Sequence, residues 1–295
     1  MNKFEGITYT ILSAQSSSED KIVKPLEHVS TMVHETDAQI IERLRGRFAI
    51  LDDMTRAVKR GDIRSLIVSG PSGVGKSYGV ESVLGKHKVM ADLASDQALK
   101  KYDIVKGSMS ALGLYAKLYE YRGYKNILVF DDCDGVFTDE LSLNILKAAL
   151  DSSKNRRINW LSDSHMLRRE DIPHSFDFHG GIIFITNMNF DKVKSAKLRP
   201  HLEALESRSL YLDLSIHNQH HKMLRIQQIV DDGMLDSYNF DEMTKGDIMA
   251  YIDLNKDNMR ELSLRSVLKV SDLVKSFPDR WETIADITIL RKHFS

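Results

Sequence analysis

The segment 70–77, with the sequence GPSGVGKS, constrains this chain more than any other feature. It matches the pattern G-x-x-x-x-G-K-[ST] at every fixed position, between an apolar run at 65–69 and a predicted helix at 78–84. Glycines allow a turn whose N–H groups converge on phosphate oxygens, and the helix adds the positive end of its dipole. We expect Lys76 to bridge the β- and γ-phosphates of a nucleoside triphosphate, and Ser77 to ligate Mg²⁺. The predicted nucleotide-binding residues are Gly70, Pro71, Ser72, Gly73, Val74, Gly75, Lys76, Ser77 and Tyr78.

The composition narrows the class of protein. Hydrophobic residues make up 42% and charged residues 28% of the 295, as in ordinary globular proteins. The formal net charge is −1, so contact with nucleic acid would require a local basic patch. The single Cys133 excludes an internal disulfide and is typical of a reducing compartment. No apolar run approaches the ~20 residues of a membrane span, so we expect a cytoplasmic protein without a membrane partner.

Short apolar runs alternate with helical patterns between residues 36 and 216. The predicted strands are 66–68, 88–90, 104–105, 127–130, 182–185 and 210–214, and the predicted helices are 36–59, 78–84, 111–121 and 141–150. Strands that are apolar on both faces and separated by helices predict an α/β fold with a parallel sheet covered on both sides. After residue 216 only helices are predicted, at 220–232, 244–254 and 264–275. We therefore expect a polar N-terminal segment at 1–35, an α/β core at 36–216 and a helical domain at 217–295.

Polar side chains follow two of the predicted strands. Asp131 and Asp132 come directly after the apolar residues 127–130. We expect Asp131 to act on the hydration shell of the metal and Asp132 to polarise the attacking water as a general base. Asn187 follows the strand 182–185, and its amide can position a water between Asp132 and the γ-phosphate. A turn-forming asparagine is the alternative for Asn187, and we expect Asp134 to be a solvated turn residue.

The order of these elements resembles the AAA+ ATPases. Residues 70–77 match Walker A, 127–132 match Walker B and 182–187 match the sensor-1 strand. The chain is similar to small single-module bacteriophage ATPases that carry a comparable Asp-Asp-Cys-Asp stretch, which would place it in the host cytoplasm if it is viral. The resemblance covers roughly residues 36–275. It implies a parallel-sheet P-loop core of the ASCE/AAA+ class, a C-terminal all-helical lid, the cofactors ATP and Mg²⁺, and a ring-shaped homo-oligomer, expected to be a hexamer.

Two arginines gain roles from this resemblance. Arg208, directly before the strand 210–214, is the candidate that reaches the γ-phosphate of the neighbouring subunit, with Arg199 as the alternative. Arg265, in the first turn of the helix predicted at 264–275, is the candidate sensor-2 arginine of the lid, with Arg260 as the alternative. Ser263 is placed to cap that helix.

Two segments are candidates for contact with a substrate. The resemblance places the pore-facing loop at 105–109, where Lys106 offers a phosphate-binding charge and the aromatic residue usual in protein unfoldases is absent. The segment 151–180 is basic in places and includes Arg156 and Arg157. We expect DNA contact through Lys106, Arg156 and Arg157; solvated side chains are the alternative.

The sequence therefore predicts an ATP hydrolase, and three outputs remain open. The first is movement or remodelling of a nucleic acid in replication, recombination or packaging. The second is remodelling of a partner protein complex, which would make turnover indifferent to DNA. The third is an ATP-binding switch or scaffold with little turnover, favoured by Asp132, which stands where most AAA+ proteins have glutamate.

Overall fold

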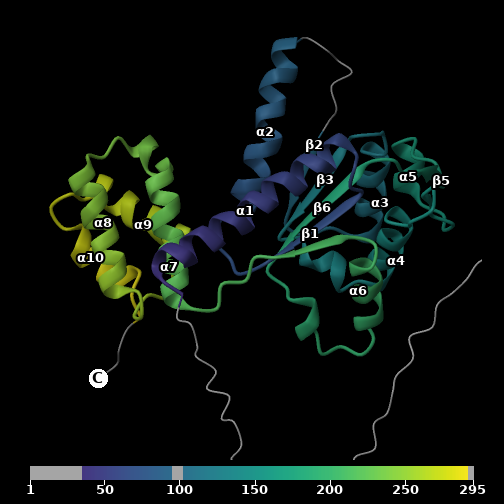
Figure 1. The fold of residues 1–295 in the computed structure, drawn as a ribbon. Helices are drawn as coiled ribbons and strands as arrows, with labels where there is room; N and C mark the ends of the chain where they lie inside the picture. The colour runs from purple at the N-terminus through teal and green to yellow at the C-terminus, as the bar shows by residue number, and fades with distance from the viewer. Residues whose placement is uncertain (1–34, 95–101, 292–295) are drawn as a thin grey trace, which may run out of the picture. The chain divides into compact units, whose positions relative to one another are not determined.

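A five-stranded parallel sheet forms the core of the α/β part of the chain (Figure 1). The computed structural model describes residues 35–94 and 102–291, with 86–94 described as backbone only. The strands, in spatial order, are β2 (Tyr102–Lys106), β3 (Ile127–Asp131), β6 (Gly181–Thr186), β1 (Ser65–Ser69) and β7 (Leu210–Asp213). Because β6 lies between β1 and β3 and all three run parallel, their carboxyl ends meet at one edge of the sheet.

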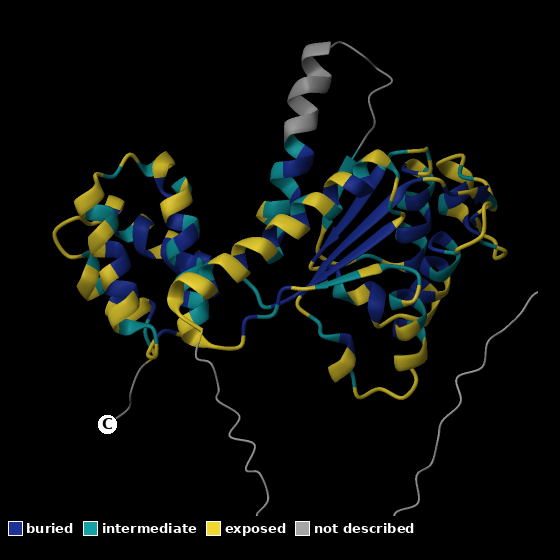
Figure 2. Ribbon diagram, viewed as in Figure 1, coloured by how far each residue is buried: buried dark blue, intermediate teal, exposed yellow. Residues whose placement is uncertain are grey.

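Helices cover both faces of this sheet. The helices α1 (Asp37–Arg60) and α2 (Lys76–Ala94) pack on one face, against side chains such as Leu66 and Ile183. The helices α3 (Ala111–Glu120), α4 (Glu140–Ala149) and α6 (Arg199–Glu206) pack on the other face, against Ile67 and Phe184. Successive strand residues point to opposite faces, so a strand buried on both sides must be apolar along its interior, as residues 127–130 of β3 and 182–185 of β6 are. Figure 2 shows the central strands as buried along their length.

One predicted strand is wrong. Residues 88–90 lie within α2, which continues from the phosphate-binding loop to Ala94. Lysine, methionine, alanine and leucine, which predominate after Gly85, are good helix formers.

The segment 151–180 contains structure that the sequence did not reveal. A two-stranded antiparallel sheet joins β4 (Arg157–Asn159) to β5 (Ser175–Asp177), with the short helix α5 (His165–Arg169) between them. Ile158, Leu167 and Phe176 from these elements are buried in the same core cluster as α3 and α4. The segment is therefore packed onto the sheet domain.

The C-terminal part is helical. It comprises α7 (Gln219–Ile229), α8 (Glu242–Asn255), α9 (Leu264–Ser276) and α10 (Trp281–Thr288), which share a hydrophobic cluster of their own. Short helical turns lie at Asp134–Phe137, Phe190–Lys192, Val230–Met234 and Asp236–Tyr238. The predicted fold class, a parallel-sheet P-loop core followed by an all-helical region, is confirmed. We call these C-terminal helices the lid.

The predictions of an N-terminal segment and of no membrane span concern residues that the structure describes only in part. The N-terminal segment predicted at 1–35 falls, except for Glu35, outside the described residues, and the three-part division of the chain remains a prediction. Within the described part of the chain, no helix combines the length and apolar character needed to cross a membrane.

Candidate functional site

The phosphate-binding loop joins β1 to α2 and depends on glycine at close approaches. Gly73 and Gly75 have φ angles of 67° and 101°, a region that glycine adopts without strain. A Cβ atom on Gly73 would lie 2.5 Å from the Cβ of Ser263 in the lid. The loop ends at Lys76, the first residue of α2, so the positive end of that helix dipole points at the loop.

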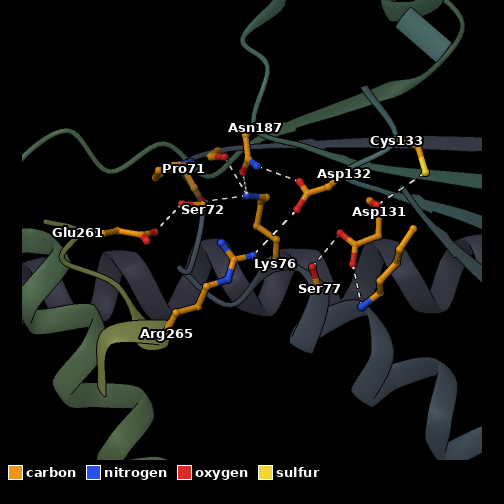
Figure 3. A network of polar contacts seen from close by, with 12 residues as sticks. Pro71, Ser72, Lys76, Ser77, Asp131, Asp132, Cys133, Asn187, Glu261 and Arg265 are labelled. Carbon is orange, nitrogen blue, oxygen red and sulfur yellow. Dashed lines mark hydrogen bonds and ion pairs between the residues drawn. The ribbon is translucent and has the colours of Figure 1, made fainter. Parts of the chain in front are cut away.

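The Lys76 side chain is held within the loop. Its Nζ donates hydrogen bonds of 2.8 Å to the backbone oxygens of Gly70 and Pro71, and a third of 2.8 Å to Asn187 Oδ1 (Figure 3). Lys76 is only 5% exposed, and burial lowers the pKa of its ammonium group to about 8. The Lys76 ammonium group therefore has three hydrogen-bond acceptors, two of them backbone oxygens of the candidate phosphate-binding loop.

Ser77 and Asp131 form the candidate metal site. Ser77 Oγ donates a 2.9 Å hydrogen bond to Asp131 Oδ1, and Asp131 is buried at the end of β3. Lys106 Nζ lies 3.2 Å from Asp131 Oδ2 and also pairs with Glu81 at 2.9 Å. The Asp131 carboxylate therefore already stabilises one positive charge, that of the Lys106 ammonium group.

The donor set fits Mg²⁺ held together with a nucleotide. Hydroxyl and carboxylate oxygens are the ligands that this ion prefers, usually one or two from the protein with water and phosphate completing the shell. The described residues contain no group of three or more His, Cys, Asp or Glu side chains that could hold a metal alone. Ser77 and Asp131 therefore suit an ion that arrives with the phosphates.

Asp132 and Asn187 are joined directly. Asn187 Nδ2 donates a 2.8 Å hydrogen bond to Asp132 Oδ1, while Arg265 Nη2 lies 4.0 Å from Asp132 Oδ2 (Figure 3). The Asp132 backbone is left-handed, with φ of 54°, and its side chain is 46% exposed. One amide thus bridges Lys76 and Asp132, and the carboxylate stays accessible to water.

The lid contacts the loop through its own polar groups. Glu261 Oε1 accepts a 2.7 Å hydrogen bond from Ser72 Oγ, and the Leu264 N–H donates to Gly73 O at 2.9 Å. Ser263 stands at the N-cap of α9, but its hydroxyl makes no capping hydrogen bond, so the prediction that it caps the helix is wrong. Its side chain instead packs against the loop glycine.

The arginine candidates differ in position. Arg265 lies in the first turn of α9 and faces Asp132, whereas the backbone N–H of the alternative, Arg260, donates to Ile289 O. Arg208 precedes β7, at the end of the sheet opposite to the loop, and its Nη1 donates to Ala204 O at 2.6 Å. Within one chain Arg208 therefore lies apart from the site, so any contact with a bound nucleotide would have to be with that of a neighbouring subunit.

Arg199 and Tyr78, two further residues with predicted roles, lie on the surface of the described chain. Arg199, the alternative to Arg208, forms a surface ion pair with Glu203 at 3.3 Å. Tyr78 lies in the first turn of α2 with its side chain 74% exposed. The nucleotide-binding role of Tyr78 remains a prediction that concerns its backbone or an exposed ring.

The predicted DNA-binding patch needs correction. Arg156 is 6% exposed, donates to Ala149 O at 3.1 Å and to Gly180 O at 3.0 Å, and stacks on the Phe178 ring. Burial lowers the pKa of its guanidinium group to about 10. Arg156 is thus a structural cation, and its predicted contact with DNA is wrong.

The other two residues predicted to contact DNA, Arg157 of the segment 151–180 and Lys106 of the loop 105–109, are already paired with acidic side chains. Arg157 is exposed, beside Asp177 at 3.8 Å, and donates to Ser175 Oγ. Lys106 is directed at Asp131 and Glu81 in this structure instead of at a separate substrate surface. A DNA-binding role for either residue would require a change of partner.

Sequence reasoning missed the role of Asp134. Its carboxylate accepts a short hydrogen bond from Thr186 Oγ1, and burial raises the pKa of the Asp134 carboxyl group. The prediction of a solvated turn residue is therefore wrong. The available signal was Thr186, a hydroxyl at the end of an apolar strand directly before Asn187.

Comparison with known proteins gives one relative in sequence and several distant likenesses in structure. No family model matches the chain. The ORC1 protein of Aeropyrum pernix, solved with DNA, is 14% identical with a TM-score of 0.46. NtrX of Brucella abortus, solved with ATP, is 14% identical with a TM-score of 0.45. The likenesses cover 84% and 81% of this chain, which spans 62% of the first protein and 53% of the second.

The relative in sequence comes from Enterobacteria phage T4. It is an uncharacterized 36.7 kDa protein in the nrdC-mobD intergenic region, 34% identical over 256 residues. The match covers 86% of this chain and 76% of the relative. The chain therefore belongs to the family of this phage T4 protein.

Proposed function

We propose that this chain is an AAA+ ATPase that binds Mg²⁺ and ATP and hydrolyses the nucleotide. The observation that carries the proposal is the Asn187 amide, which accepts a hydrogen bond from Lys76 and donates one to Asp132. A purely structural asparagine would need only one of these contacts. Hydrolysis of a terminal phosphate uses a cation that holds the phosphate and a base that activates the water, and this amide places the two groups beside each other.

Each residue of the site has a role in this proposal. Lys76 leaves the Gly70 and Pro71 oxygens to bind the β- and γ-phosphates, and Ser77 with Asp131 holds the metal ion. When bound, Mg²⁺ neutralises charge that develops on the phosphate oxygens. Asp132 accepts a proton from the attacking water, which Asn187 orients.

We further propose that hydrolysis takes place between subunits of a ring. This proposal is supported by Arg208, which stands away from the site of its own chain and would stabilise the transition state of a neighbour. Arg265 would contact the phosphates of its own subunit and link them to lid movement. The division into an N-terminal segment at 1–35, a core at 36–216 and a lid at 217–295 is part of the same proposal.

For the output we retain movement or remodelling of a nucleic acid as the first candidate, now without Arg156. Its remaining support is Lys106, beside the metal site, and the exposed Arg157. Remodelling of a protein complex is the second candidate. It is favoured by the ion pairs of Arg157, Arg168 and Arg169 with nearby acids, which neutralise the segment 151–180.

A mixing experiment tests the proposal. Lys76→Ala and Arg208→Ala should each abolish ATP turnover. In an equal mixture, a subunit with intact Lys76 meets a neighbour with intact Arg208 at about a quarter of random interfaces, so about a quarter of wild-type turnover should return. No recovery, or an active Arg208→Ala protein, would contradict action between subunits. Turnover of the wild type with and without DNA distinguishes the two outputs.

A further inference from the structure

We propose that Arg225, on the lid helix α7, is a second lid cation that binds the phosphates of the nucleotide. Sequence analysis singled out Arg265 and Arg260 in the lid and gave no role to Arg225. The inference rests on the proposed function, because it adds a residue to the same site. Three observations carry it: the missing counter-charge of Arg225, its position beside the loop, and the donors left without acceptors around it.

Arg225 is a cation without a counter-ion in the part of the chain that the structure describes. Its guanidinium lies 3.6 Å from the centre of the Phe48 ring, and its Nη1 donates to Gln228 Oε1. No aspartate or glutamate of the described residues lies within 4.0 Å of it. The acids that influence it electrostatically, Asp52 and Asp232, are paired with other arginines.

Arg225 is partly buried, which makes that situation costly. Desolvation lowers the pKa of the Arg225 guanidinium to about 10. A charge removed from water without an opposite charge destabilises a protein unless a ligand or partner compensates it. An anion bound beside Arg225 would supply that compensation.

The position of Arg225 indicates which anion. A Cβ atom on Gly75 would lie 3.9 Å from Arg225 Nη2, and 3.4 and 3.7 Å from the side chains of Ile229 and Leu264. Gly75 directly precedes Lys76 at the start of α2, where backbone N–H groups and the helix dipole favour phosphate. Arg225 thus meets the phosphate-binding loop from the lid, while Phe48 supports it from α1.

The unsatisfied atoms around Arg225 are all donors. Among the described residues, Arg225 Nε has no hydrogen-bond partner, and neither has Nε2 of Gln228, which is 3% exposed. A ligand that complements these groups must bring acceptors and negative charge. Phosphate oxygens provide both, and guanidinium groups bind them with charge-assisted hydrogen bonds.

Nucleotide affinity of a charge-deleting variant tests this assignment. Arg225→Met keeps much of the side-chain volume and the contact with Phe48, whereas Arg225→Lys keeps the charge. Lys222→Met, on the same helix, is the matched control for loss of one positive charge. Affinities for Mg·ATP and for inorganic tripolyphosphate should be measured by calorimetry on the full chain, with the melting temperature of each ligand-free variant recorded.

We expect Arg225→Met to weaken both ligands by at least tenfold. Arg225→Lys should retain part of the affinity, and Lys222→Met should retain all of it. The melting temperature of ligand-free Arg225→Met separates an effect on folding from an effect on binding, because the variant removes an uncompensated charge but also removes the donor to the buried Gln228 Oε1.

Three outcomes would overturn the inference. Unchanged affinity of Arg225→Met, with binding still lost in Lys76→Ala, would refute the role of Arg225 and leave the proposed function standing. Weaker ATP binding with unchanged tripolyphosphate binding would assign Arg225 to the nucleoside instead. Failure of the wild type to bind either ligand would refute the proposed function itself.

Discussion

Replacing Asn187 by alanine removes two hydrogen bonds, the one that Asn187 accepts from Lys76 and the one that it donates to Asp132. Each contact is a 2.8 Å hydrogen bond to a charged group, a class that contributes roughly 1.5–3 kcal/mol. Lys76 keeps two carbonyl acceptors and Asp132 is 46% exposed to water, so we expect the free energy of unfolding to fall by only about 1 kcal/mol. Turnover should fall much more, by about 10²–10³-fold, as for other preorganised groups that act on a transition state.

The assay compares kcat with nucleotide affinity. Asn187→Ala should bind ATP within about threefold of the wild type, because Lys76 and the loop remain, while kcat falls. Asn189→Ala, which removes only the cap of Phe190–Lys192, is the control and should leave both unchanged. Asn187→Asp should also lose turnover, because it brings a carboxylate against Asp132. If Asn187→Ala kept kcat within about threefold of the wild type, the bridging role would be refuted.

Three other predictions follow from the contacts and burial described above. Arg156→Met should lower the free energy of unfolding by about 2–4 kcal/mol, because two buried carbonyls lose their donor, whereas Arg157→Gln should change it by less than about 0.5 kcal/mol in urea titration. Lys76 has a pKa of about 8 when folded, lowered by burial from the model-peptide value of 10.5, so the unfolded chain binds more protons between these values. With a metal chelator present, the free energy of unfolding of the wild type minus that of Lys76→Met should therefore rise by about 1.4 kcal/mol per pH unit from pH 8 to 10. A difference that does not change with pH would contradict the lowered pKa. Ser72→Ala and Glu261→Gln should each weaken the contact between loop and lid, detected as faster hydrogen exchange at residues 72–75, and unchanged exchange in both would argue against it.

The sheet and its polar edge could be predicted because their signals are local. β1, β3 and β6 are buried on both faces, so their central residues are constrained to be apolar and polar residues are confined to the strand ends. Parallel strands end at the same edge, which places Asp131, Asp132 and Asn187 together beside the loop. The spacing of the motifs therefore contained most of the candidate site.

Features that depend on tertiary packing could not be predicted. Arg156 and Arg157 are adjacent and chemically identical, yet the Arg156 side chain is buried and the Arg157 side chain is exposed. The difference arises because consecutive residues there point to opposite sides. The run 88–90 resembles a strand in isolation and becomes helical as the continuation of α2. Arg225 is one arginine on a lid helix, and its proximity to Gly75, its lack of a counter-ion among the described residues and its unpaired Nε become visible only in the folded chain.

The most direct test of the central claim is calorimetric binding of ATP to the purified full chain, with and without Mg²⁺, followed by steady-state turnover of the same samples. The account predicts that the wild type binds Mg·ATP and releases phosphate, that Asp131→Ala loses the effect of Mg²⁺ on binding, and that Lys76→Ala binds at least tenfold more weakly. Equal ATP affinity in the wild type and Lys76→Ala, or binding without any response to Mg²⁺, would contradict it.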